Sequence, residues 1–181
     1  MLTVVFDSPD GGFGLINLQG IPKPSWHAFR LLHKLGDEVL ARHDDHGIVT
    51  RCSTTGLLSA LIFHYPTEVK TSPPPAYMDR NAALATVNTG SPARKQLLLT
   101  DISPGTLFRL EKLAPRAKGD PVSMWRAWGC PSSLSRELTK ELRSIAETLT
   151  THYIVTPESG QILIDEAMVP WSFTALTQVT T

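Results

Sequence analysis

The sequence has little cysteine, no excess of charge of either sign and no long apolar run. Its two cysteines, Cys52 and Cys130, are too few for a disulfide framework, and neither has a second cysteine at the spacing of a zinc site. The 17 basic and 17 acidic residues cancel, which removes any global electrostatic reason to bind nucleic acid. No apolar run approaches the roughly 20 residues that span a bilayer, so no membrane segment is predicted.

The composition, with 41% hydrophobic and 19% charged residues, is typical of a folded globular protein. No basic region precedes the short apolar run at the N-terminus, so a signal peptide is not expected and the default compartment is the cytoplasm. A complete (β/α)8 barrel needs about 250 residues. This chain has 181 residues and is too short to form one.

The apolar periodicity predicts a mainly β protein with two long helices. The first helix follows Ser25 as a capping residue, runs to about Lys34 and ends at Gly36. The second runs from about Leu134 to Leu149. Strands are expected where short β-prone runs lie between turn signals, with a hairpin around Asp44-Asp45-His46-Gly47 and only loose alternation at Val122–Trp128. The expected strands are Val39–Arg42, Ile48–Ser53, Leu57–Tyr65, Gln96–Leu99, Gly105–Leu113, Gln161–Ile164 and Trp171–Val179. Residues 66–94 form either a wrapping loop or a loop that contains a short edge strand near Ala82–Val87. Together these elements predict an antiparallel β-sandwich with an N-terminal amphipathic helix and one inserted helix.

Residues 11–37 form the string GGFGLINLQGIPKPSWHAFRLLHKLGD, and Trp125-Arg-Ala-Trp-Gly-Cys-Pro lies further along the chain. Both stretches resemble glycoside hydrolase family 39, which includes β-xylosidases and α-L-iduronidases. The first is similar to the end of that family's catalytic barrel, and a third stretch, Ile162–Val179, resembles its closing strands. The resemblance implies two parts: residues 1–36 as a remnant of the last β/α unit of a barrel, and residues 37–181 as a β-sandwich domain.

Members of this family are retaining glycosidases, and the resemblance implies two catalytic glutamates that lie upstream of the matched segment. One of them stands in an Asn-Glu-Pro motif, and this sequence contains no Asn-Glu pair. No residue is therefore assigned a catalytic role. If the chain is active by itself, its candidate carboxylates are the neighbours Asp44/Asp45 and Asp165/Glu166. Retaining hydrolysis needs two carboxyl groups about 5–5.5 Å apart, whereas neighbours on a strand point to opposite faces.

Aromatic residues are the candidates for carbohydrate contact, because their faces stack on sugar rings. Trp125, Trp128 and Phe13 are the residues proposed for this role. No metal site and no cofactor are predicted. The cluster from His43 to His46 carries metal-binding side chains, but its four groups cannot converge from one hairpin tip.

The leading hypothesis is a carbohydrate-associated accessory module of a family-39-like glycosidase, without the catalytic glutamates. A second hypothesis is a minimal β-glycosidase, acting on β-xylosides or β-glucosides, whose site is rebuilt at an oligomer interface. A third is an interaction module for a separately encoded barrel. The apolar helix face needs a cover once the barrel is absent, so we expect a homo-oligomer or a partner barrel there. That face consists of Trp26, Phe29, Leu32 and Leu35.

Overall fold

The computed structural model describes residues 14–43, 46–71, 82, 85–86 and 88–180. Antiparallel strands dominate this part of the chain, as the sequence predicts. The strands are β1 (Glu38–His43), β2 (Gly47–Arg51), β3 (Leu58–His64), β4 (Ala93–Leu99), β5 (Leu107–Leu113), β6 (Thr150–Val155), β7 (Ile162–Met168) and β8 (Ser172–Gln178). The helices are α1 (Pro24–Leu32), α2 (Thr67–Thr71), α4 (Pro121–Ala127) and α5 (Arg136–Glu147).

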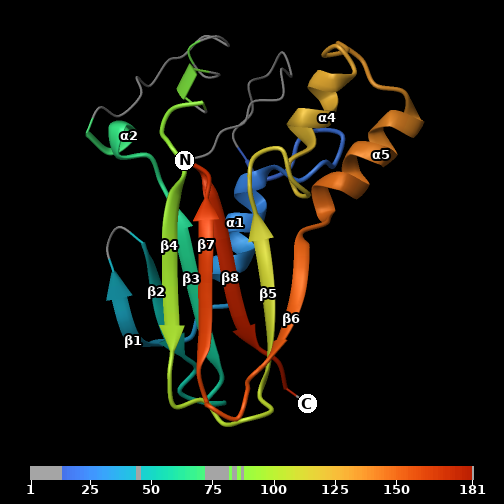
Figure 1. Cartoon of the computed structure of the whole chain (residues 1–181). Helices are drawn as coiled ribbons and strands as arrows, with labels where there is room; N and C mark the ends of the chain where they lie inside the picture. The colour runs from blue at the N-terminus through green and yellow to red at the C-terminus, as the bar shows by residue number, and fades with distance from the viewer. Residues whose placement is uncertain (1–13, 44–45, 72–81, 83–84, 87, 181) are drawn as a thin grey trace.

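Two sheets face each other. The larger has six strands in the order β1-β2-β3-β8-β5-β6, and the smaller is the pair β4-β7, with neighbours antiparallel in both. Figure 1 shows the smaller sheet in front of the larger one and α1 behind it. Alternate residues of β3, β5 and β8 point toward β4 and β7, because side chains alternate across a strand. They form the sandwich core of Ala60, Ile62, Leu99, Ile102, Phe108, Leu110, Ile162, Ile164, Met168 and Leu176.

Helix α1 covers the other face of the large sheet through Leu31, and Leu35, just after the helix, also packs there. Leu31 packs with Leu61, Leu113, Leu149 and Ala175. By contrast, Phe29 is 60% exposed and Leu32 is 44% exposed. The helix therefore has two apolar sides, one packed on the sheet and one facing outward.

The ends of α1 also differ from the predicted ones. The helix begins at Pro24 after Lys23, so Ser25 is not the capping residue, and the C-cap is His33. A proline at the first helical position loses nothing, because its missing N–H has no partner inside the helix anyway. Gly36 has a different role from the predicted cap. A Cβ atom there would collide with the backbone of Arg51, so the close approach of two backbones requires glycine.

A second correction concerns Val122–Trp128, which forms helix α4 instead of a loosely alternating segment. Asp120 caps this helix by accepting a hydrogen bond from the Val122 N–H, and Pro121 follows at the first position. Helices α4 and α5 pack on each other at one end of the sandwich and bury Ile21 between them. The described residues 82, 85 and 86 are helical, so they do not form the possible edge strand.

Candidate functional site

The two candidate carboxylates on β7 point to opposite faces of the strand. Asp165 lies on the outer face and accepts hydrogen bonds from Arg94 at 2.7 Å and from Gln96 at 2.9 Å. Those hydrogen bonds, with the charge of Arg94, lower the pKa of the Asp165 carboxyl to about 2. Glu166 points inward, pairs with Lys112 at 2.6 Å and accepts a hydrogen bond from the Thr174 hydroxyl. The structure thus does not bring these two carboxylates together.

The other candidate pair, Asp44 and Asp45, lies outside the described residues, as does Phe13. On either side of the gap, the imidazole rings of His43 and His46 stack 4.2 Å apart. His46 Nδ1 also lies 3.0 Å from the Lys95 ammonium. Within the described ranges, no three His, Cys, Asp or Glu side chains gather in a way that could hold a metal ion.

The two candidate tryptophans lie in different environments. Trp125 is 8% exposed, belongs to the small core between α4 and α5, and donates its Nε1–H to the Pro131 carbonyl at 3.1 Å. Its ring is therefore not available to stack on a sugar. Trp128 is only half-buried against the same core. Of the two tryptophans, only Trp128 keeps surface for such a contact.

A buried charge cluster joins α1 to the large sheet. The Glu111 side chain on β5 is 1% exposed and lies within ion-pair distance of three cations. Arg30 approaches it at 3.0 Å and Arg109 at 3.1 Å, and Lys34 is its third partner. Burial raises the pKa of the Glu111 carboxyl, but the hydrogen bonds from Lys34 and Arg30 outweigh it, and the pKa lies below its ordinary value. The carboxylate is thus held ionised as a structural anchor.

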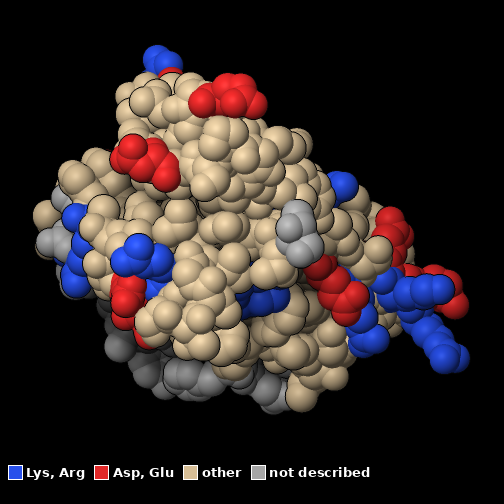
Figure 2. Space-filling model, turned by 90° about the horizontal axis from the view of Figure 1, so that it is seen from below, with Lys and Arg blue, Asp and Glu red and all other residues tan. Residues whose placement is uncertain are grey.

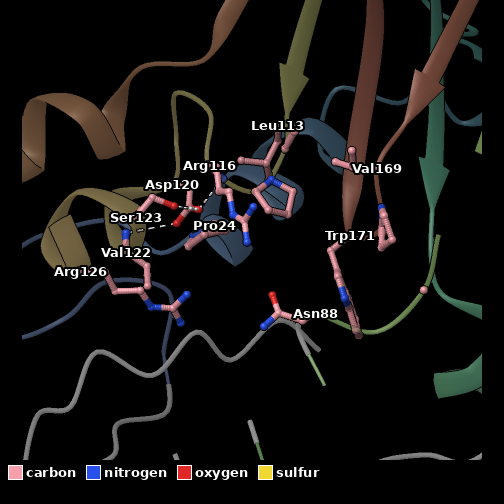
Figure 3. A pocket seen from close by; sticks show the side chains of 14 residues that line it. Pro24, Asn88, Leu113, Arg116, Asp120, Val122, Ser123, Arg126, Val169 and Trp171 are labelled. Atoms are coloured by element: carbon pink, nitrogen blue, oxygen red, sulfur yellow. Dashed lines mark hydrogen bonds between the residues drawn. The ribbon is translucent and has the colours of Figure 1, made fainter. Parts of the chain in front are cut away.

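A hollow of about 220 Å³ lies between the start of α1, the turn before α4 and the start of β8. Figure 3 shows the guanidinium groups of Arg116 and Arg126 and the amide of Asn88 turned toward the same space, with Trp171 on its far side. Apolar side chains line the rest of the wall, among them Pro24, Leu113, Val122, Val169 and Pro170. The hollow therefore combines an apolar wall with two cationic groups.

Sequence reasoning missed the residues of this hollow. The signal that could have found Arg126 is Asp120-Pro121, a capping residue followed by proline, which marks the start of a helix. With α4 recognised, Arg126 falls in the last helical turn. The sequence predicts a strand that begins at Trp171, but Trp171 lies just before β8 with a φ of 66°. No local pattern signals that such a backbone turns this side chain into the wall of a hollow.

The surface at the opposite end of the molecule is different. Figure 2 shows small groups of basic and acidic side chains scattered over a mostly uncharged face, with neither sign forming a continuous patch. In the part of the chain that the structure describes, no helix is both long enough and apolar enough to cross a membrane.

The fold is a β-sandwich with α1 on one face and α4 and α5 at one end, and comparison with known proteins gives the family. The model of glycosyl hydrolases family 39 matches residues 3–162, so the chain belongs to that family. It is 29% identical over 134 residues to a β-xylosidase of Geobacillus stearothermophilus, covering 74% of this chain and 22% of that enzyme. It is 26% identical over 171 residues to a β-xylosidase of Caldicellulosiruptor saccharolyticus, covering 92% of this chain and 31% of that enzyme.

Solved structures agree on the fold. A family-39 enzyme from Xanthomonas axonopodis pv. citri superposes with a TM-score of 0.72 at 22% identity, over 94% of this chain and 33% of that one. A monomeric β-xylosidase from Caulobacter crescentus CB15 gives a TM-score of 0.66 at 22% identity, over 93% of this chain and 33% of that one. The chain thus spans a third or less of the length of the relatives it matches.

Proposed function

We propose that this chain is the β-sandwich module of a family-39-like glycoside hydrolase, that it supports a catalytic barrel and that it is not catalytic by itself. One observation carries the proposal: α1 packs Leu31 on the sheet and leaves Phe29 and Leu32 exposed. A helix shared between a sandwich and a barrel needs two apolar sides, one for each neighbour. Residues 1–36 then supply the last β/α unit of that barrel.

Apolar residues just before α1 are exposed as well. Leu15, Ile16 and Leu18 are 36%, 50% and 81% exposed. Exposed apolar residues in such number are typical of an interface. We therefore define the barrel face of the module as Leu15, Ile16, Leu18, Phe29 and Leu32.

A barrel covers this face better than a second copy of the chain does. A relative about three times as long as this chain is described as monomeric, so no second copy covers that relative. We expect the isolated chain to be monomeric in sedimentation at micromolar concentration. A stable dimer that dissociates on Phe29→Asp and Leu32→Asp substitution would show that a second copy is the partner instead.

The charges on β7 support the non-catalytic part of the proposal. A general acid of a glycosidase needs a carboxyl whose pKa is raised, and that of Asp165 is lowered to about 2 by Arg94 and Gln96. Glu166 points to the other face and is held by Lys112 and Thr174. Neither side chain has the environment of an acid/base pair.

The test is an assay of the purified chain with aryl β-xyloside and aryl β-glucoside, following release of nitrophenol. We expect no turnover above that of the buffer. Turnover that survives repurification and falls in the Asp165→Asn or Glu166→Gln variant would contradict the proposal and establish a rebuilt catalytic site. The Glu38→Gln variant, which changes an exposed carboxylate on β1, is the matched control.

A chimera tests the supporting role. This chain replaces the matching segment of the Caldicellulosiruptor saccharolyticus β-xylosidase, and the melting temperature and xylosidase activity are measured. We expect Phe29→Asp with Leu32→Asp to lower both. The control is Leu98→Asp on β4, another exposed leucine, which should leave both unchanged. Equal effects of the two sets of substitutions would contradict the assignment of the barrel face.

A further inference from the structure

We propose that the hollow beside α1 binds a carboxylate carried on a single ring, with Arg116 and Arg126 holding the carboxylate and Trp171 forming part of the wall beside the ring. This proposal does not depend on the proposed function, because it is argued from side chains in the described part of this chain that line the hollow.

The two arginines are available to an anion. In the part of the chain that the structure describes, neither the Arg116 nor the Arg126 guanidinium makes an ion pair or a hydrogen bond, and both side chains are exposed. Figure 3 shows them approaching the hollow from two different segments, the turn before α4 and the end of α4 itself. Two unpaired cations at one hollow create a positive potential that attracts anions. A guanidinium also offers a planar pair of N–H donors that matches the two oxygens of a carboxylate.

Among the described residues, one acidic side chain, Asp120, lines the same hollow, and its oxygens already accept hydrogen bonds. They accept hydrogen bonds from the Arg116 N–H at 2.7 Å, from the Val122 N–H at 3.1 Å and from the Ser123 hydroxyl at 3.0 Å. These bonds fix the turn that carries Arg116 and the first turn of the helix that carries Arg126. Asp120 therefore holds both arginine-bearing segments in place, which lowers the entropic cost of ligand binding.

The opposite wall of the hollow suits a ring with a polar edge. Trp171 is 6% exposed, and its buried Nε1–H has no acceptor among the described residues. A buried donor without an acceptor is costly, so a ligand oxygen at this position would be favoured. Trp171 also holds a φ of 66°, a backbone conformation that is rare outside glycine and that is enriched at functional sites.

The size of the hollow limits the ligand. Pockets for drug-sized molecules have about 300–1,000 Å³. The hollow has about 220 Å³, which fits a single ring better than an oligomer. Sugar acids and aromatic acids share the required chemistry of a carboxylate on a ring, and the experiment distinguishes these two sources.

The experiment is a calorimetric titration of the full chain with D-glucuronate and with benzoate. Their neutral counterparts, D-glucose and benzamide, and inorganic sulfate serve as comparison ligands. We expect at least one of the two carboxylates to bind about tenfold or more tightly than its neutral counterpart and than sulfate, because charge-assisted hydrogen bonds are stronger than neutral ones. Preference for glucuronate identifies a sugar acid, and preference for benzoate identifies an aromatic acid; both support the proposal.

Matched variants locate the binding. Arg116→Gln and Arg126→Gln should each weaken carboxylate binding about tenfold. Arg136→Gln, which changes another exposed arginine at the start of α5, should leave it unchanged. Carboxylate binding should also change the tryptophan fluorescence, and the Trp171→Phe variant should lose this change. Circular dichroism of each variant shows whether it is folded.

Three results would overturn the proposal. The first is the absence of binding by both carboxylates at millimolar concentration. The second is binding of sulfate or of the neutral counterparts as tightly as the carboxylates. The third is carboxylate binding that is unaffected in the folded Arg116→Gln and Arg126→Gln variants.

Discussion

The Glu111 carboxylate on β5 accepts a hydrogen bond from the Arg30 guanidinium on α1 over 3.0 Å. Lys34, near the end of the same helix, reaches the other carboxylate oxygen, and Arg109 completes the group from β5 itself. The carboxylate is buried, whereas Arg30 and Lys34 remain about a quarter exposed. This cluster fixes the orientation of α1 on the sheet and thereby decides which side of the helix faces outward.

Replacing Glu111 by Gln should lower the free energy of unfolding by about 2 kcal/mol, since the hydrogen bonds to charged groups are lost and the cations are left without their counter-ion. This loss is smaller than is usual when a buried ion pair is broken, because Arg30 and Lys34 are partly exposed and can bind water once the carboxylate is gone. Urea denaturation measures the change. The control, Glu38→Gln, breaks the exposed pair with Arg51 and should cost less than about 0.5 kcal/mol. Equal costs for the two variants would show that burial adds nothing to the Glu111 cluster.

The same cluster predicts how the free energy of unfolding depends on pH in the acidic range. The pKa of Glu111 is lower in the folded chain than its ordinary value of 4.5. The stability it contributes is therefore fully present above that value and is lost as the pH falls through the lower, folded pKa. The Glu111→Gln variant should show a shallower loss of stability below about pH 4.5 than the unchanged chain. Parallel profiles for the two proteins would exclude Glu111 as a source of acid sensitivity.

Most strands of the sandwich could be predicted from the sequence, because a strand and the turns that bound it are marked by patterns only a few residues long. The hairpin of β1 and β2 was placed by the Asp44-Asp45-His46-Gly47 turn, and its register pairs Arg42 with Ile48. Helix α5 was placed by its leucine spacing, and Leu142 is fully buried as expected. Strand β6 was missed, since its short alternation directly follows the end of that helix.

Features that depend on residues far apart in the sequence are harder to predict. For α1, the apolar spacing identifies the side that contains Phe29 and Leu32, which is exposed, but it does not show that Leu31 packs on the sheet. A helix between two layers has two such sides, and its own sequence does not say which layer is present. The candidate binding residues were missed for a similar reason. Arg116 and Arg126 lie in different segments, and Asp120 brings them to one hollow through hydrogen bonds.

His27 provides a second pH-dependent contribution to stability. It is completely buried, and its Nε2–H donates to the Ala146 carbonyl of α5. Burial lowers the pKa of the imidazole below its ordinary value of 6.5, and its Nδ1 has no partner among the described residues. Stability should therefore fall as the pH drops from about 6.5 toward the lower, folded pKa.

The His27→Gln variant tests this contribution, because glutamine can still donate to the Ala146 carbonyl but does not titrate. We expect its unfolding free energy to vary less between pH 5 and 6.5 than that of the unchanged chain. The exposed His152 on β6 is the control position, and His152→Gln should keep the original pH dependence. If the His27→Gln variant also keeps the original pH dependence of the unfolding free energy, the buried imidazole is not the source of that dependence.

The charge state of Asp165 distinguishes a structural from a catalytic carboxylate. Arg94 and Gln96 lower its pKa to about 2, and the Arg94→Gln variant should shift it toward the ordinary value of 3.8. Carbon-detected NMR titration of the side-chain carboxyl measures both values. A pKa above 3.8 in the unchanged chain would reopen the case for Asp165 as a general acid, since such a group must hold its proton near neutral pH.

Two adjacent leucines of α1 provide the sharpest test of the helix's two sides. Leu31 is 1% exposed and packs on the sheet, whereas Leu32 is 44% exposed. Leu31→Ala should lower the unfolding free energy by about 2–5 kcal/mol, because it removes buried methyl groups and leaves a cavity. Leu32→Ala in the isolated chain should change it by no more than about 0.5 kcal/mol, since alanine also favours the helix.

The concentration dependence of unfolding separates the possible partners of this outer side. If a second copy covered Leu32, unfolding of the unchanged chain would shift to higher urea with protein concentration, and Leu32→Ala would abolish that shift. We expect no shift for either protein. In the barrel-containing chimera, by contrast, Leu32→Ala should approach the cost of Leu31→Ala, because both leucines are then buried. A Leu32 effect that stays below about 0.5 kcal/mol in a folded chimera would contradict a barrel on this side of α1.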